Sequence, residues 1–219
     1  MNKIFNHILV PEIKLTDEII DGKRFYTLPD GKTKLRSVTT IISEKSDKSA
    51  LFAWKKRVGE KEANRITKKA TTHGTAVHKI AERYLLNEAD IKQKSMPTSV
   101  DGFAKIKKIL DENVNDIMGI ELPLFSTTLG CAGRTDVVAH YNGIPSIIDF
   151  KTSIKNKKEE WIQNYFIQST VYSMMFESMY KKKIPQIVII IAVEEENYPQ
   201  IFIKNRSDYV NKVLEMFVG

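Results

Sequence analysis

The chain of 219 residues lacks several features that define common classes of protein. Cys131 is the only cysteine, which excludes an internal disulfide, a Cys-x-x-Cys zinc site and a four-cysteine iron–sulfur cluster. The longest wholly apolar run, 187–193, is far too short to cross a bilayer. The sequence also contains no P-loop, no His-Glu-x-x-His motif and no internal repeat. A lysine-rich chain with one unpaired cysteine is typical of the cytoplasm, so we expect that location.

The composition is that of a folded chain with unevenly distributed charge. Apolar residues make up 42% and charged residues 28%, so the chain can form a hydrophobic core. The formal net charge is +7. Residues 1–110 hold 23 Lys and Arg against 13 Asp and Glu, whereas residues 111–219 hold 11 against 14. The basic half favours a polyanionic partner such as nucleic acid, and on charge alone a solubilising surface is an equal alternative.

The order of residue patterns predicts one mixed domain, 1–219. Strands and turns are expected in residues 1–43, including a β-branched strand at 37–42. Helices are expected at 47–70, 72–86, 100–115, 158–180 and 207–217, and strands at 120–125, 134–141, 144–151, 187–193 and 200–204. We therefore expect an α/β (α+β) fold, a mixed β-sheet core flanked by helices. Within it, residues 1–115 would form a basic, mainly helical part and residues 116–219 the α/β core.

A β-hairpin is predicted at Asn142-Gly143, because this dipeptide between two strand patterns favours a two-residue turn. Counting outward from the turn puts Asp136 directly opposite Asp149 on the same face. Opposed carboxylates destabilise a sheet unless they share a proton or hold a divalent cation. Lys151 lies two residues beyond Asp149 and faces the same side, where it can act on water or phosphate. The alternative is a buried ion pair with a structural role only.

Other candidate residues lie on predicted helices. His78 lies at the edge of an apolar arc, where a core histidine is the alternative to a metal ligand. Gln168 shares a face with Tyr172 and other aromatic residues, and it needs hydrogen-bond partners if it is buried. A basic run consists of Lys55, Lys56 and Arg57. This run is either a solvated helix face or a contact for nucleic-acid phosphates.

Four short blocks follow one another along the chain: Gly74-Thr-Ala-Val-His78, Gly133-Arg-Thr-Asp136, Ile148-Asp-Phe-Lys-Thr152 and Gln168-Ser-Thr-Val-Tyr172. In this order and spacing the chain resembles the PD-(D/E)XK nucleases, specifically the RecB-like branch. The Ser-Val-Thr-Thr-Ile run at 37–41, Trp54 and the basic helix are similar to genome-maintenance exonucleases of that branch, including phage-encoded ones. The resemblance covers most of the chain.

The resemblance implies a restriction-endonuclease-like fold with an N-terminal helical and β-hairpin addition. It also implies a metal site for Mg²⁺ or Mn²⁺ formed by His78, Asp136, Asp149 and the backbone carbonyl of Phe150. Glu121 matches a recurrent acid of the family and would reach the metal through water. Whether Glu121 does so is left open by its position beside Pro123.

The resemblance also implies roles in catalysis. Lys151 would position or deprotonate the attacking water, and Gln168 would orient the site or contact DNA. Tyr172 would support Gln168 and bind the substrate, and the basic run at 55–57 would bind the DNA backbone. The expected activity is metal-dependent exonuclease cleavage of single-stranded or frayed DNA, in a host cytoplasm if a phage encodes the chain. The alternatives are an accessory nucleic-acid-binding protein with an inactive nuclease fold and an endonuclease of the same fold.

Overall fold

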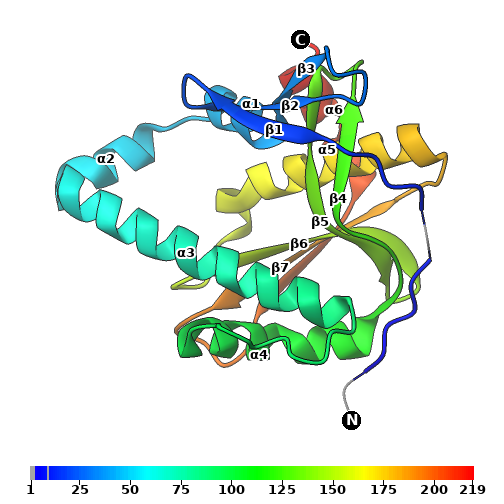
Figure 1. Ribbon diagram of the computed structural model, residues 1–219. Coiled ribbons are helices and arrows are strands. Elements are labelled where there is room, and N and C mark those ends of the chain that lie inside the picture. Colours follow the sequence, from blue (N-terminus) through cyan, green and yellow to red (C-terminus); the bar gives the residue numbers. More distant parts are fainter. Residues whose placement is uncertain (1–2, 9) are drawn as a thin grey trace.

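The computed structural model describes residues 3–8 and 10–219 (Figure 1). Within these residues the strands are β1 (Thr16–Ile20), β2 (Lys23–Thr27), β3 (Lys34–Ser37), β4 (Val114–Ser126), β5 (Cys131–Tyr141), β6 (Ile144–Ser153), β7 (Gln186–Val193) and β8 (Gln200–Asn205). The α-helices are α1 (Val38–Lys45), α2 (Ser49–Val58), α3 (Glu60–Leu85), α4 (Pro97–Asn113), α5 (Gln163–Tyr180) and α6 (Val210–Phe217). Short 3₁₀ helices, η1 (Glu159–Ile162) and η2 (Arg206–Tyr209), precede α5 and α6.

The strands form one mixed sheet. Its main path runs β1-β2-β3-β5-β6-β7-β8, and β4 pairs with β5. The pairings β3–β5 and β6–β7 are parallel, whereas β1–β2, β2–β3, β4–β5, β5–β6 and β7–β8 are antiparallel. Strand β7 is apolar and almost fully buried, as expected for a strand covered on both faces. The predicted mixed sheet flanked by helices is confirmed.

Helices cover both faces of this sheet. One hydrophobic core packs α1, α5 and α6 against the first face, and another packs α3 and α4 against the second. Figure 1 shows α5 above strands β6 and β7 and α4 below them, while α2 and the start of α3 extend away from the sheet. In the second core Val77 of α3 lies with Val137 of β5 and Ile148 of β6, so the two parts of the chain share buried surface.

The strand predicted at 37–42 is wrong, because β3 ends at Ser37 and α1 begins at the next residue. Ser37 is the N-cap of α1, and its hydroxyl accepts a hydrogen bond from the Thr40 N–H at 3.0 Å. The buried residues of α1 are Val38, Ile41 and Ile42. Their i, i+3, i+4 spacing and the cap outweigh the preference of β-branched residues for strands.

The two helices predicted at 47–70 and 72–86 are divided at a different residue. Gly59 has a φ angle of 83° and separates α2 from α3, which then continues without interruption for 26 residues. This backbone conformation favours glycine, which explains the position of the break. The helix predicted at 100–115 begins three residues earlier, because Pro97 is the first residue of α4, where its missing N–H leaves no hydrogen bond unmade.

The N-terminal hairpin is continuous with the sheet. Strands β1 and β2 meet at a turn formed by Asp21 and Gly22, with φ angles of 49° and 75°. Strand β3 then pairs in parallel with the start of β5. A smaller core beneath the hairpin contains Tyr26, Leu28 and Ala132. The hairpin expected as an addition is therefore anchored to the strand that carries Asp136.

Among residues 3–8 and 10–219, none of the helices combines the length and the apolar character needed to cross a membrane.

Candidate metal centre

Strands β5 and β6 form the hairpin predicted at Asn142-Gly143. Both turn residues have positive φ angles, 51° and 77°, as a tight hairpin turn requires. The pairing keeps the predicted register as far as Val137↔Ile148. In this register the next pair outward is Asp136 and Asp149, but the regular pairing stops one step before it. The carboxylates therefore lie at the point where the two strands separate.

A side-chain hydrogen bond marks this separation. In a continued ladder the Phe150 N–H would donate to the Thr135 carbonyl. It donates instead to Oδ2 of Asp136, at 2.8 Å. From this region onward β6 pairs only with β7, in parallel, up to Ser153. The Asp136 carboxylate thus takes the place of a backbone acceptor, which fixes its orientation.

Glu121 faces Asp136 from β4, on the other edge of β5. The flanking pairs are Ile120↔Val137 and Leu122↔Thr135. Glu121 has a φ angle of 48°, in the left-handed region that is unfavourable for residues with a side chain. Such conformations persist where the surroundings enforce them, and they gather at functional sites. The structure therefore places Glu121 beside Asp136. The sequence alone had left open whether Glu121 could reach a metal there.

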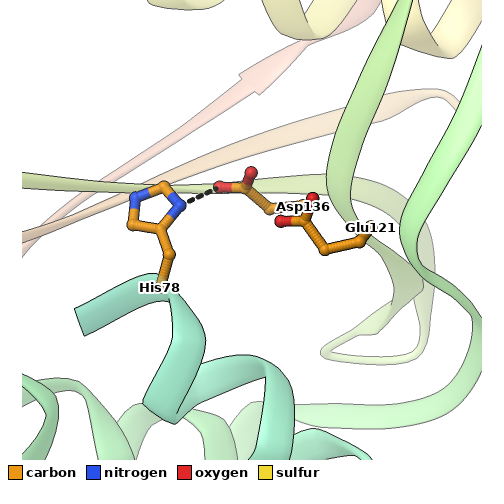
Figure 2. A group of neighbouring side chains, drawn as sticks. All are labelled: His78, Glu121 and Asp136. Atoms are coloured by element: carbon orange, nitrogen blue, oxygen red, sulfur yellow. Dashed lines mark ion pairs between the residues drawn. The ribbon is translucent and has the colours of Figure 1, made fainter. Parts of the chain in front are cut away.

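Three side chains converge on one point between α3 and the sheet. One ligand atom from each of His78, Glu121 and Asp136 lies within 4.8 Å of the other two (Figure 2). Nδ1 of His78 is 3.4 Å from Oδ2 of Asp136. Within the described part of the chain, Glu121 makes no hydrogen bond or ion pair through its carboxylate. Two carboxylates and an imidazole nitrogen form a donor set that suits Mg²⁺ or Mn²⁺.

Asp149 lies outside this group of three and is neutralised by a lysine. Its side chain is 2% exposed and forms an ion pair with Lys151. Nε2 of the half-buried Gln168 donates to Oδ1 of Asp149 at 3.2 Å, so Gln168 has a hydrogen-bond partner. The ammonium of Lys151 also lies 5.0 Å from the centre of the Tyr165 ring. The Asp149 and Phe150 carbonyl contributions to a metal site stay predictions.

Burial and charge act together on these groups. Burial raises the pKa of Asp149 to about 6. Burial alone would raise the pKa of Asp136 as well, but the charges of His78 and Lys151 hold that pKa below its ordinary value. Burial, and then the charge of Asp136, raises the pKa of Glu121. Negative charge is therefore concentrated where a cation would relieve it.

An open cleft of about 610 Å³ lies beside these groups, and His78, Glu121 and Lys151 form part of its wall. Its lining comprises Gly74, Thr75, His78, Lys79 and Glu82 of α3, Glu121 of β4, Lys151 and Thr152 of β6, and Arg24 of β2. A Cβ atom on Gly74 would lie 3.2 Å from Oγ1 of Thr152, so glycine allows the close approach of α3 to β6. Sequence reasoning missed Arg24, because no local pattern predicts that the N-terminal hairpin reaches this cleft.

The other predicted substrate contacts lie elsewhere. Tyr172 is 3% exposed and its ring packs on Gly133, where a Cβ atom would come within 2.9 Å of it. Tyr172 therefore supports β5, and its contact with substrate stays a prediction. The basic run at 55–57 lies on α2, before the break at Gly59. Helix α3 begins at Glu60, and His78 lies roughly 27 Å along the helix from that residue. The basic run precedes Glu60 and is therefore remote from the cleft.

Comparison with known proteins gives a distant relationship. No family model matches the chain. The chain is 24% identical over 180 residues to mitochondrial genome maintenance exonuclease 1 of Homo sapiens. The match covers 77% of this chain and 52% of the human protein, so the chain spans about half the length of the curated relative it matches. The similarity supports a relationship to a nuclease.

Proposed function

We propose that the chain is a metal-dependent DNA exonuclease that hydrolyses phosphodiester bonds at single-stranded or frayed ends. The observation that carries this proposal is the convergence of His78, Glu121 and Asp136 beside a cleft that His78 and Glu121 line. The distant relative is named an exonuclease, which supports the same class of reaction. The order of the four nuclease-like sequence blocks supports it independently.

Mg²⁺ or Mn²⁺ would be held by His78, Glu121 and Asp136, with the Asp149 carboxylate and the Phe150 carbonyl as further ligands. A bound dication would polarise the phosphate and lower the pKa of an attacking water. The donor set fits such an ion, because the Glu121 carboxylate has no other partner among the described residues. The Phe150 ring meets the His78 ring edge to face, with centroids 6.0 Å apart, and so steadies the imidazole.

The remaining groups orient and stabilise charge. Lys151 is paired with Asp149 and therefore protonated, so its ammonium can donate to a phosphate oxygen as negative charge develops there. This pairing favours charge stabilisation over the role of base. The Gln168 amide holds Oδ1 of Asp149 and so fixes the direction in which Asp149 presents its other oxygen. Tyr172, packed on Gly133, supports the strand that carries Asp136.

Digestion of end-labelled oligonucleotides tests the proposal. We expect single-stranded oligonucleotides to be shortened from an end in Mg²⁺ or Mn²⁺ and to stay intact in EDTA, while circular single strands resist. Asp136→Asn should abolish cleavage, because it removes a ligand. The matched control Asp101→Asn changes an exposed aspartate of α4 that pairs only with Lys105, and it should cleave normally.

Each alternative predicts a different result. Cleavage of the circular strand would assign the chain to the endonucleases. Metal-independent binding of DNA without cleavage would assign it to accessory proteins with an inactive nuclease fold. Cleavage by Asp136→Asn at the wild-type rate would place the active site elsewhere in the molecule.

The cytoplasmic location is a further proposal. Cys131 is free and buried, and burial raises the pKa of its thiol to about 12. An unpaired, unreactive thiol suits a reducing compartment. Fractionation of the producing cell, with the chain detected by antibody, tests this assignment, and recovery from an oxidising compartment would contradict it.

A further inference from the structure

A second pocket lies on another flank of α3, between that helix and the start of α4. Its volume is about 390 Å³. His73 lines it and His78 faces the cleft; the two histidines are five residues apart, which is about 7.5 Å along the helix and about 140° around it. The pocket is therefore separate from the candidate metal centre, and the proposed reaction assigns it no role.

Basic side chains of α3 dominate the lining. Arg65, Lys68 and Lys69 line the pocket against a single acid, Glu194. Arg65 is engaged by Glu62 at 2.7 Å. Within 3–8 and 10–219, the structure gives Lys68 and Lys69 no ion-pair partner. The two lysines outnumber the one acid of the lining, so the pocket carries a net positive charge.

The amino end of α4 opens into the same pocket through Thr98 and Ser99. The N-cap residue, Met96, has no side-chain oxygen to accept from the first turn. Ser99 and Val100 donate their N–H groups to the Met96 carbonyl, whereas the Thr98 N–H has no acceptor in the described part of the molecule. The end of this 17-residue helix thus presents an unused donor and the positive end of its dipole.

An unsatisfied histidine nitrogen completes the pocket. The His73 side chain is nine-tenths buried, and its Nε2 atom has no hydrogen-bond partner among the residues that the structure describes. Nδ1 lies 3.5 Å from Oγ of Ser99. When the Ser99 hydroxyl donates to Nδ1, the proton of the neutral ring is on Nε2, which then needs an acceptor. The nearest carboxylate, Glu194, is 3.8 Å away, beyond hydrogen-bond distance.

From these features we infer that the pocket between α3 and the start of α4 binds a phosphate group. The pocket offers several donors: two lysines, a free N–H at the helix end and a buried imidazole N–H. An anion with several acceptor oxygens could accept hydrogen bonds from all of them. Phosphate offers those oxygens, and both a DNA strand and a released mononucleotide carry it. The choice of a nucleotide as its source rests on the proposed function; the phosphate site itself does not.

Glu194 opposes the anion and covers the imidazole. Its side chain is 45% exposed, so it can turn into solvent when phosphate enters. Repulsion between this carboxylate and the phosphate must then weaken binding. Removing the charge with Glu194→Gln should strengthen phosphate binding several-fold, whereas a pocket without an anion site would show no change.

Calorimetric titration of the metal-free protein in EDTA tests the site. The probes are inorganic phosphate, thymidine 5′-monophosphate and thymidine. We expect the two phosphate-bearing probes to bind, thymidine not to bind, and Lys68→Gln/Lys69→Gln to weaken binding at least tenfold. Both lysines are exposed, so this variant should fold. The matched control Lys182→Gln/Lys183→Gln removes another adjacent pair of exposed lysines.

Imidazole NMR gives a second readout at the site itself. The His73 ring resonances should shift on addition of phosphate, and those of His140 should not. Equal affinity in the wild type and Lys68→Gln/Lys69→Gln, or an unshifted His73 ring, would overturn the inference. An unphosphorylated thymidine tetranucleotide separates the sources: loss of its binding in the double variant assigns the pocket to backbone phosphate, and unchanged binding assigns it to a phosphomonoester.

Failure of this inference and failure of the proposed function give different results. The titrations contain no metal and therefore do not depend on cleavage. A protein that cleaves DNA but binds phosphate independently of Lys68 and Lys69 keeps its function and loses this site. A protein that never cleaves DNA but binds phosphate through them keeps the site and loses the function.

Discussion

At the scale of single residues, Glu121 is the side chain whose position is hardest to explain without a bound cation. It is held in a left-handed conformation, faces another carboxylate and has a raised pKa. Each of these features destabilises the folded chain. They are explained if the position of Glu121 is maintained for binding a metal, because a dication reverses the repulsion between Glu121 and Asp136.

Glu121→Gln should therefore stabilise the metal-free protein. The amide removes the repulsion but is a poorer metal ligand. For about 1 kcal/mol of relieved repulsion, the melting temperature in EDTA should rise by about 2–4 °C. Added Mg²⁺ should stabilise the variant less than the wild type. The control Glu112→Gln alters an exposed acid of α4, and a wild-type response of Glu121→Gln to Mg²⁺ would exclude Glu121 as a ligand.

The sequence predicted the candidate site unevenly. Asp136, Asp149 and Lys151 were predictable because a two-residue turn sets the register of a hairpin, and the register sets the face. The hydrogen bond from Gln168 to Asp149, by contrast, depends on how α5 lies on the sheet. Arg24 was not predictable, because its place in the cleft depends on a long-range pairing. The turn chemistry therefore predicts the geometry of the hairpin, whereas tertiary packing decides where Gln168 and Arg24 lie.

At the scale of elements, the cap of α1 explains why a β-branched run forms a helix. Ser37→Ala should lower the free energy of unfolding by about 1 kcal/mol, because the Thr40 N–H loses its acceptor. Urea unfolding measures the change. Ser43→Ala, at an exposed position later in α1, is the control and should have little effect. Equal stability of the two variants would show that packing alone sets the start of α1.

Helix α2 lies apart from the cleft, so its proposed role in binding DNA can be tested separately from the proposed catalysis. Because α2 is remote from the cleft, neutralising its basic run, Lys55→Gln/Lys56→Gln/Arg57→Gln, should weaken binding of long oligonucleotides. If all three side chains contact phosphates of a single strand, the slope of log K against log salt should fall by about 2. Cleavage of very short substrates should be unchanged. An unchanged slope would show that the run only solvates α2.

At the scale of the whole molecule, the layers were predictable and their connections were not. The order of helix and strand patterns, with a wholly apolar strand at 187–193, indicated a sheet covered by helices. The parallel contact of β3 with β5 was not predictable, because it joins residues about a hundred positions apart through only two pairs. That contact brings the N-terminal hairpin to the candidate metal centre and makes one structural unit of sheet and hairpin.

The candidate metal centre also joins two layers, because His78 comes from α3 whereas Glu121 and Asp136 come from the sheet. A bound metal should therefore stabilise the contact between these layers. At a metal concentration 100 times the dissociation constant, the stabilisation is about 2.7 kcal/mol. Hydrogen exchange should show slower opening of both α3 and β4–β5 in Mn²⁺ than in EDTA.

His78→Ala decides whether α3 takes part in this coupling. If His78 is a ligand, the variant should still show metal protection of β4–β5 through the two carboxylates but lose it in α3. Mn²⁺ should be affected more than Mg²⁺, because it accepts imidazole nitrogen more readily. If His78 is only a packing residue against Phe150, the variant should melt at a lower temperature yet keep metal protection in both layers. The second result would mean that only the carboxylates bind the metal and that α3 is a wall of the cleft. A helix that supplies no ligand gains protection from hydrogen exchange only through its contacts with the sheet.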